Sequence, residues 1–142
     1  MNGLNSKRIV LGAVTGGFAW IVWSGLINTV FLGQRYVVAQ DTGTLLSESR
    51  YGFFLPVYFL SLLAISFVLA WLYAGVRTTF GPGPGTALKL GAVVGFAIAF
   101  PLNFSTASWV PVSRFFPLMW MLELWVGAIL AAVIAGWFYY DD

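Results

Sequence analysis

One carboxylic acid is the residue of this chain best placed to do chemistry. Glu123 lies within WMLELWVGAILAAVIAGWFYY, which is apolar and long enough to cross a bilayer, and no other acid lies inside such a stretch. A carboxyl group at membrane depth is costly in either protonation state, so it usually has a partner and often a function. Two roles are therefore open: a structural one, in which Glu123 pairs with Arg35, Arg114 or an asparagine, and a functional one in a site for a ligand, an ion or a partner.

The remaining composition excludes most catalytic and metal chemistry. The chain has no Cys and no His, which removes thiolate nucleophiles, zinc and iron–sulfur sites, Ser-His-Asp triads and His-ligated haem. Five acids are too few and too scattered for a metal cage, and Glu123 lacks the nearby second carboxylate, His or Cys that general acid–base catalysis would use. We therefore expect a protein that is not an enzyme, with no metal and no obligatory cofactor, in which a lipid, a quinone or a pigment could still bind.

The elements that position Glu123 must be embedded in lipid. Of the 142 residues, 60% are hydrophobic and only 8% are charged, whereas a soluble domain carries about 25% charged residues. Such a chain cannot cover its own surface in water, so the bilayer is its first partner. The net charge of +2 rests on scattered basic residues, which suits loops facing anionic lipid and does not suit a nucleic-acid surface.

Four stretches reach the roughly 20 apolar residues that a helix needs to span a bilayer. They cover about 9–33, 53–79, 86–109 and 117–140, and nothing between them is long enough for a soluble domain. The sequence therefore predicts an all-α fold, an integral membrane four-helix antiparallel bundle that forms a single transmembrane domain over residues 1–142.

The placement of basic residues predicts the orientation. The side that carries both termini has four of them and the other side has three: Lys7, Arg8, Arg77 and Lys89 against Arg35, Arg50 and Arg114. Loops rich in Lys and Arg stay in the cytoplasm, and the first helix usually dominates. We expect both termini in the cytoplasm and the chain in a bacterial inner membrane.

A polar cluster is expected in one leaflet of the bilayer. Because successive spans reverse direction, residues late in the first and third spans lie at the depth of residues early in the second and fourth. That rule gathers the candidate intramembrane polar cluster: Asn28, Ser61, Asn103, Ser105, Thr106, Arg114 and Glu123. Pro101 also frees a carbonyl near Ala97, for which Ser105 or Thr106 could be the partner.

Rows of small residues continue the helix faces that carry some of these polar side chains. Residues four apart share a face, and small residues mark the sides on which membrane helices meet closely. The rows are Gly127, Ala131 and Ala135 beyond Glu123; Gly91, Gly95 and Ala99 before Asn103; and Gly12, Gly16, Trp20 and Ser24 before Asn28. The polar side chains are therefore predicted to point into the bundle.

Two connections carry further signals. GPGPG at residues 81–85 is typical of a tight turn between spans, and Thr86 is well placed to cap the next helix. Residues 34–52 form the longest and most polar connection, which suits either a short interfacial helix or cap over the bundle, or a mobile linker.

The segment WLYAGVRTTFGPGPGTALKLG, from Trp71 to Gly91, resembles a family of small uncharacterised bacterial four-span inner-membrane proteins. Members of that family show a span ending in WLY, then an Arg, then FGPGP-x-TA at the start of the next span. GAVTGGFAW and LINTVFLG in the first span, and LELWVGAILAAVIAGWFYY in the last, are similar to it as well. Gly85 stands where the family often has a basic residue, and the first span lacks the acid often found there. The resemblance implies the fold and a bacterial inner membrane, and it implies no activity and no catalytic residues.

Two functions remain in competition. The first is an accessory or scaffold subunit of a larger membrane complex, of respiratory or photosynthetic type, because the chain is small, lacks redox ligands and has many aromatic residues able to pack against other membrane subunits. The alternative is a small transporter or a lipid- or quinone-binding protein that uses an intramembrane pocket around Glu123.

Overall fold

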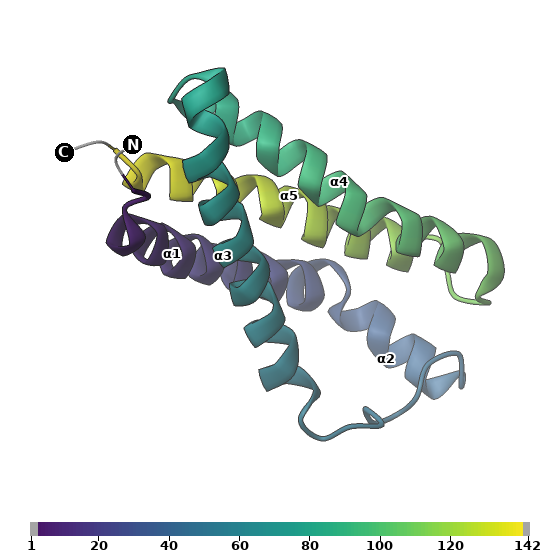
Figure 1. The fold of residues 1–142 in the computed structure, drawn as a ribbon. Coiled ribbons are helices and arrows are strands. Elements are labelled where there is room, and N and C mark those ends of the chain that lie inside the picture. Colours follow the sequence, from purple (N-terminus) through teal and green to yellow (C-terminus); the bar gives the residue numbers. More distant parts are fainter. Residues whose placement is uncertain (1–2, 141–142) are drawn as a thin grey trace.

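The fold is built from helices. The structure, a computed structural model, describes residues 3–140, and within that range helices are the only regular secondary structure. In chain order they are α1 (Ser6–Leu26), the π-helix η1 (Ile27–Phe31) that continues it, α2 (Gly33–Asp41), α3 (Phe54–Phe80), α4 (Pro84–Trp109) and α5 (Phe115–Phe138) (Figure 1).

Four helical segments are long and apolar enough to cross a membrane. They are Ser6–Phe31, Phe54–Phe80, Pro84–Trp109 and Phe115–Phe138, close to the four stretches expected from the sequence. Large apolar side chains cover the outside of the bundle, for example Val22, Val93 and Leu102, each about seven-tenths exposed. The all-α membrane bundle is confirmed, and its outer surface is suited to lipid.

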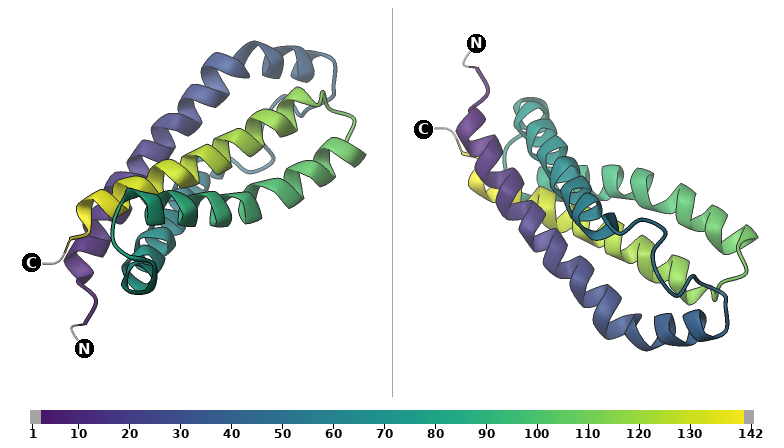
Figure 2. Two further views of the ribbon diagram at one scale, coloured as in Figure 1. Left: turned by 90° about the horizontal axis from the view of Figure 1, so that it is seen from above. Right: turned by 90° about the horizontal axis from the view of Figure 1, so that it is seen from below.

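Helix α5 is the centre of the bundle. It lies between α1 and α4 and runs along both of them (Figure 2), while α3 crosses the others at a steep angle (Figure 1). The carboxyl-terminal half of α3 packs against α1 and α5 in the hydrophobic core, through residues such as Leu69, Ala70 and Ala74. The amino-terminal half of α3 diverges from α4, so these two helices are separated at one end of the bundle. Helix α2 lies at that same end (Figures 1 and 2).

The rows of small residues lie at the helix contacts, as predicted. A β-carbon on Gly12 would lie 2.9 Å from Cα of Ala135, and one on Gly91 would lie 2.7 Å from Cα of Ile129. Gly127 leaves room for the indole of Trp20, which is fully buried. Backbones can approach this closely in a membrane only where side chains are minimal.

The turn between α3 and α4 differs from the prediction in one detail. Gly81 and Gly83 adopt positive φ angles of 86° and 129°, which glycine tolerates without strain. Helix α4 then begins at Pro84, because the fixed φ of proline suits the first helical position. Thr86 therefore lies inside the first turn instead of capping it, and its hydroxyl donates to the carbonyl of Gly81 at 2.8 Å.

The opposite ends of the chain meet at the closed end of the bundle. The backbone N–H of Asn5 donates to the hydroxyl of Tyr139 at 3.1 Å. Arg77, which is buried near the end of α3, donates to the carbonyl of Tyr139 at 3.1 Å. The start of α1 and the end of α5 therefore share one side of the membrane, as an even number of crossings requires.

Candidate binding site around Glu123

Glu123 faces the interior of the bundle. It sits on α5 one turn before Gly127, at the end of the row of small residues that packs against α1, and only 2% of its surface is exposed. The indole N–H of Trp20 donates to its backbone carbonyl at 3.2 Å, which fixes α5 against α1 at this depth. The carboxyl group is therefore held inside the protein, away from the acyl chains.

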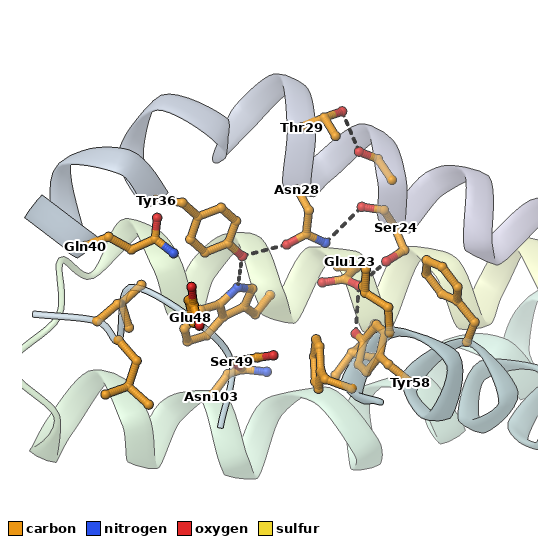
Figure 3. Close-up of a pocket in the computed structure, with 18 of the residues that line it drawn as sticks. Ser24, Asn28, Thr29, Tyr36, Gln40, Glu48, Ser49, Tyr58, Asn103 and Glu123 are labelled. Carbon is orange, nitrogen blue, oxygen red and sulfur yellow. Dashed lines mark hydrogen bonds between the residues drawn. The ribbon is translucent and has the colours of Figure 1, made fainter. Parts of the chain in front are cut away.

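Two hydroxyl groups hold the carboxylate. Ser24 Oγ, from α1, donates to Oε1 of Glu123 at 2.5 Å, and Tyr58 Oη, from α3, donates to the same oxygen at 2.7 Å (Figure 3). Within residues 3–140 the other oxygen, Oε2, receives no hydrogen bond. Every fully buried side-chain oxygen or nitrogen in that range has a hydrogen-bond partner, so Oε2 is not fully buried. Oε2 therefore retains exposed surface, and that surface faces the cavity that Glu123 lines.

The partners of the carboxylate are neither of the two arginines, nor the asparagine, that the sequence left open as structural partners. Arg35, on α2, places its guanidinium 3.9 Å from the centre of the Phe115 ring. Arg114 is exposed at the start of α5. Among the described residues, neither arginine pairs with Glu123.

A second set of hydrogen bonds fastens α2 over the site. The indole N–H of Trp120 donates to the Tyr36 hydroxyl at 2.8 Å, and that hydroxyl donates to Oδ1 of Asn28 at 2.6 Å. The Asn28 amide in turn donates to the carbonyl of Ser24 at 2.9 Å. Of the two possibilities left open for residues 34–52, the first part of the segment is a helix that caps the bundle.

The π-helix η1 explains how Asn28 reaches both neighbours. A π-turn shifts the backbone bonds to i+5, as in the bond from Leu32 N to Ile27 O at 3.1 Å. The carbonyl of Ser24, just before this turn, accepts both from the backbone N–H of Ile27 and from the Asn28 side chain. π-helices of this kind often occur at functional sites.

Tyr36 keeps its proton in this setting. It lies on α2, outside the four spans. Burial raises the pKa of the Tyr36 phenol; the hydrogen bond from Trp120 opposes that shift and the charge of Glu123 adds to it. The hydroxyl therefore stays neutral at physiological pH and can both donate to Asn28 and accept from Trp120.

A cavity of about 870 Å³ lies between Glu123 and the cap (Figure 3). All five helices, η1 and the connection after α2 contribute to its lining, which consists of Ser24, Gly25, Asn28, Thr29, Tyr36, Gln40, Leu45, Leu46, Glu48, Ser49, Phe54, Leu55, Tyr58, Phe59, Leu102, Asn103, Trp120, Glu123 and Leu124.

The buried members of the lining are polar, and its exposed members include both apolar and polar side chains. Its only buried members are Ser24, Asn103 and Glu123, all of them polar. Phe54, Leu55 and Leu102 line the cavity and are also at least half exposed on the outer surface, where α3 and α4 diverge. Between α3 and α4 the cavity therefore has an apolar mouth, whereas exposed polar side chains line it on the side of η1, α2 and the connection after α2: Thr29, Gln40, Glu48 and Ser49.

The predicted polar cluster is only partly assembled. Glu123, Asn28 and Asn103 all line the cavity, and the Asn103 amide donates to the carbonyl of Ala99 at 2.8 Å. The other members, Ser61, Ser105, Thr106 and Arg114, do not line it.

The three excluded residues within helices lie on other faces of those helices, and Arg114 precedes the first residue of α5. Ser61 is exposed, and its hydroxyl donates to the carbonyl of Val57 at 2.8 Å. Ser105 and Arg114 are exposed as well. The hydroxyl of Thr106 donates to the carbonyl of Leu102 at 2.9 Å, and so does not serve the carbonyl freed by Pro101. Depth in the membrane alone does not determine which face of a helix points inward.

Sequence reasoning also missed four residues of the site: Ser24, Tyr36, Tyr58 and Trp120. Ser24 belongs to the small-residue row of α1 and could have been included. Trp120 lies three residues before Glu123, a spacing that puts two side chains on one helix face. Tyr36 and Tyr58 carried no such signal, because their roles depend on the cap and on the steep crossing of α3.

Comparisons of the chain with protein-family models, with curated proteins and with solved structures find no match.

Proposed function

We propose that this protein is a non-catalytic integral membrane protein that binds an amphiphilic small molecule, such as a lipid, a quinone or a lipophilic ion, in the cavity around Glu123. The observation that carries the proposal is that the cavity combines buried polar groups, among them Glu123 and Asn103, with an apolar mouth between α3 and α4. Its volume of about 870 Å³ suits a small-molecule site, since such pockets measure about 300–1,000 Å³.

The position of the mouth favours a ligand that comes from the bilayer. Between α3 and α4 a molecule can pass from lipid into the cavity while its apolar part stays beside Phe54, Leu55 and Leu102. Its polar group then reaches Oε2 of Glu123 and the buried side of Asn103. Binding of this kind avoids leaving a polar head in hydrocarbon, which is costly without a partner.

A binding role fits the chemistry at Glu123 better than a catalytic role does. The groups that contact the carboxylate are the hydroxyls of Ser24 and Tyr58. Neither is a base that could exchange a proton with Glu123 near neutral pH, and a catalytic site needs such a matched pair.

The test is to fill the cavity without disturbing the bundle. A β-carbon on Gly25 would meet no atom within 4 Å, and Gly25 lines the cavity. Gly75, on the exposed face of α3, has equally open surroundings and is remote from the cavity, so Gly75→Leu is the matched control.

We expect the wild-type protein and the Gly75→Leu variant, purified in a neutral maltoside detergent, to bind a short-chain benzoquinone or a radiolabelled lipophilic ion saturably. The Gly25→Leu variant should bind neither. Absence of saturable binding of every such probe to the wild-type protein, or equal binding to both variants, would refute the proposal.

An accessory-subunit role is the second candidate, and one feature favours it. Three phenylalanines form a row of stacked rings on α4. The ring centres of Phe96 and Phe100 are 4.8 Å apart, and those of Phe100 and Phe104 are 5.3 Å apart. In both pairs the angle between the ring planes is 12°. Phe96 and Phe104 are exposed, so another membrane subunit could pack there. Native electrophoresis in mild detergent tests this role, which fails if the chain always migrates alone.

We further propose that the protein acts in a bacterial inner membrane. The resemblance of the Trp71–Gly91 segment to bacterial four-span proteins, together with the placement of basic residues, supports a bacterial inner membrane with both termini in the cytoplasm.

A further inference from the structure

We infer, on the basis of the proposed binding function, that the cavity selects a lipophilic cation, an organic ammonium- or phosphonium-type charge on an apolar body, with Glu123 as its counter-ion. The charges of the lining, the free oxygen of Glu123 and the aromatic walls each favour this class of ligand over anionic amphiphiles and over neutral quinones.

The lining carries negative charge alone. Glu123 stands at the inner end, and Glu48, from the connection after α2, adds a second carboxylate. Among the described residues that form the lining, none is a lysine or an arginine. The arginines of this side lie elsewhere: Arg35 covers the ring of Phe115, while Arg50 and Arg114 are exposed. A cleft lined by one sign of charge attracts the opposite sign and repels its own, so fatty acids and anionic lipids are disfavoured.

The hydrogen bonds of Glu123 point to the same class. Both hydroxyls donate to Oε1, which leaves the lone pairs of Oε2 for the cavity. A carboxylate oxygen accepts hydrogen bonds and attracts positive charge. A quinone carbonyl is itself an acceptor and has nothing to offer Oε2. If the carboxyl group served only to join α1, α3 and α5, both of its oxygens would be expected to have helix partners.

Aromatic rings complete the site. Tyr36, Phe54, Tyr58, Phe59 and Trp120 all line the cavity, and Phe54 and Tyr58 stack with their ring centres 5.5 Å apart. The faces of aromatic rings attract cations, more strongly where water is excluded. These rings therefore suit both the charge and the apolar body of a lipophilic cation.

The experiment compares two ions of similar size and shape and opposite charge. Radiolabelled tetraphenylphosphonium and tetraphenylborate are equilibrated with purified full-length protein in a neutral maltoside detergent, and a short-chain benzoquinone serves as the neutral probe. The variants are Glu123→Gln, which keeps the shape of the side chain and removes its charge, and Glu48→Gln at an exposed position. Ser61→Ala, on the lipid-facing side of α3, is the control.

We expect saturable binding of tetraphenylphosphonium and none of tetraphenylborate. Glu123→Gln should weaken the binding roughly tenfold or more, as loss of one partner of a buried charge pair does. Glu48→Gln should weaken it by about two- to fivefold, since exposed ion pairs contribute little. Ser61→Ala should leave it unchanged. If Glu123→Gln does not fold, the comparison of the two ions and the Glu48→Gln variant still decide the question.

The results that overturn the inference are separable from those that overturn the proposed function. Equal saturable binding of both ions, or saturable binding of the quinone but not of tetraphenylphosphonium, refutes the choice of a cation and leaves an amphiphile site in place. Saturable binding of none of the three probes refutes the cation and the proposed function together.

Discussion

Removal of the two hydroxyls that hold Glu123 should show whether this carboxylate contributes more to stability than an average polar contact between membrane helices. Ser24→Ala and Tyr58→Phe each delete one of the hydrogen bonds to Oε1, at 2.5 and 2.7 Å. Tyr58→Phe keeps the ring and its stacking on Phe54. Neither change creates a large void, so the free energy of unfolding should report mainly on the hydrogen bonds.

Two reference magnitudes bracket the expected effect. Polar contacts between membrane helices contribute on average about 0.6 kcal/mol, whereas a hydrogen bond to a charged group contributes about 1.5–3 kcal/mol. Each single variant should lie near the lower figure, because the remaining hydroxyl still donates to the same oxygen. The double variant leaves Oε1 of the buried Glu123 without either donor. Its cost should therefore exceed the sum of the single costs by about 1 kcal/mol or more.

The measurement is a double-mutant cycle. Unfolding of each variant in mixed micelles of maltoside and dodecyl sulfate is monitored by tryptophan fluorescence. The cycle is repeated in a Glu123→Leu background, where the coupling between Ser24 and Tyr58 should vanish. If the losses in unfolding free energy simply add, each at or below about 0.6 kcal/mol, cavity water replaces the two hydroxyls. The conclusion that Ser24 and Tyr58 hold the carboxylate would then be wrong.

Three further predictions follow from other parts of the molecule. Gly16→Ala should destabilise the bundle by about 1–3 kcal/mol, because the added carbon would lie 2.7 Å from the carbonyl oxygen of Ala131, whereas Gly75→Ala meets nothing within 4 Å and should be neutral in the same unfolding assay. Trp120→Phe removes the donor to Tyr36. Amide hydrogen exchange over Gly33–Asp41 should therefore accelerate, while exchange in the middle of α5 should not. Equal rates in the variant and the wild type would contradict the role of this bond in holding α2 over the site. Reporter fusions at the two termini should both be cytoplasmic, and a periplasmic signal from either would refute the predicted orientation.

The sequence was sufficient for the fold because its strongest signals are local. The length of each apolar run fixes the spans, and the alternation of direction fixes which helix ends share a leaflet. The small-residue rows were also reliable, since a helix face is a matter of spacing: Gly91, Gly95, Ala99 and Asn103 are all buried, as expected.

The site was harder to predict because it depends on helix rotation and crossing angle. Ser61 and Tyr58 are three residues apart on α3, yet only Tyr58 reaches Glu123. The difference arises from the steep crossing of α3, which no pattern in the span specifies. Tyr36 reaches the site because the chain continues through a π-helix into α2, and neither feature has a signature in the sequence.

The cavity nevertheless has a physical origin in the sequence, in the place where small residues stop. On α3 the buried row Ser66, Ala70 and Ala74 allows close packing, but the preceding turns, FLPVYFL from residue 54 to 60, offer only bulky side chains and proline.

The same change occurs at the same depth in the other spans. On α5 the small residues end at Gly127 and Glu123 follows toward the cap; on α4 they end at Ala99 and Asn103 follows. Since backbones separate where side chains become large, α3 and α4 separate from α5 at that level, while α1 stays joined to α5 through Trp20 and Ser24. The polar groups on the inner faces then border a cavity instead of a neighbouring backbone. A bundle that needed only stability would continue its small residues to the end of each helix. Replacing Tyr58 and Phe54 by alanine should therefore let α3 approach α5 and shrink the cavity. Unchanged probe binding in a variant that still folds would contradict the view that these bulky residues hold the site open.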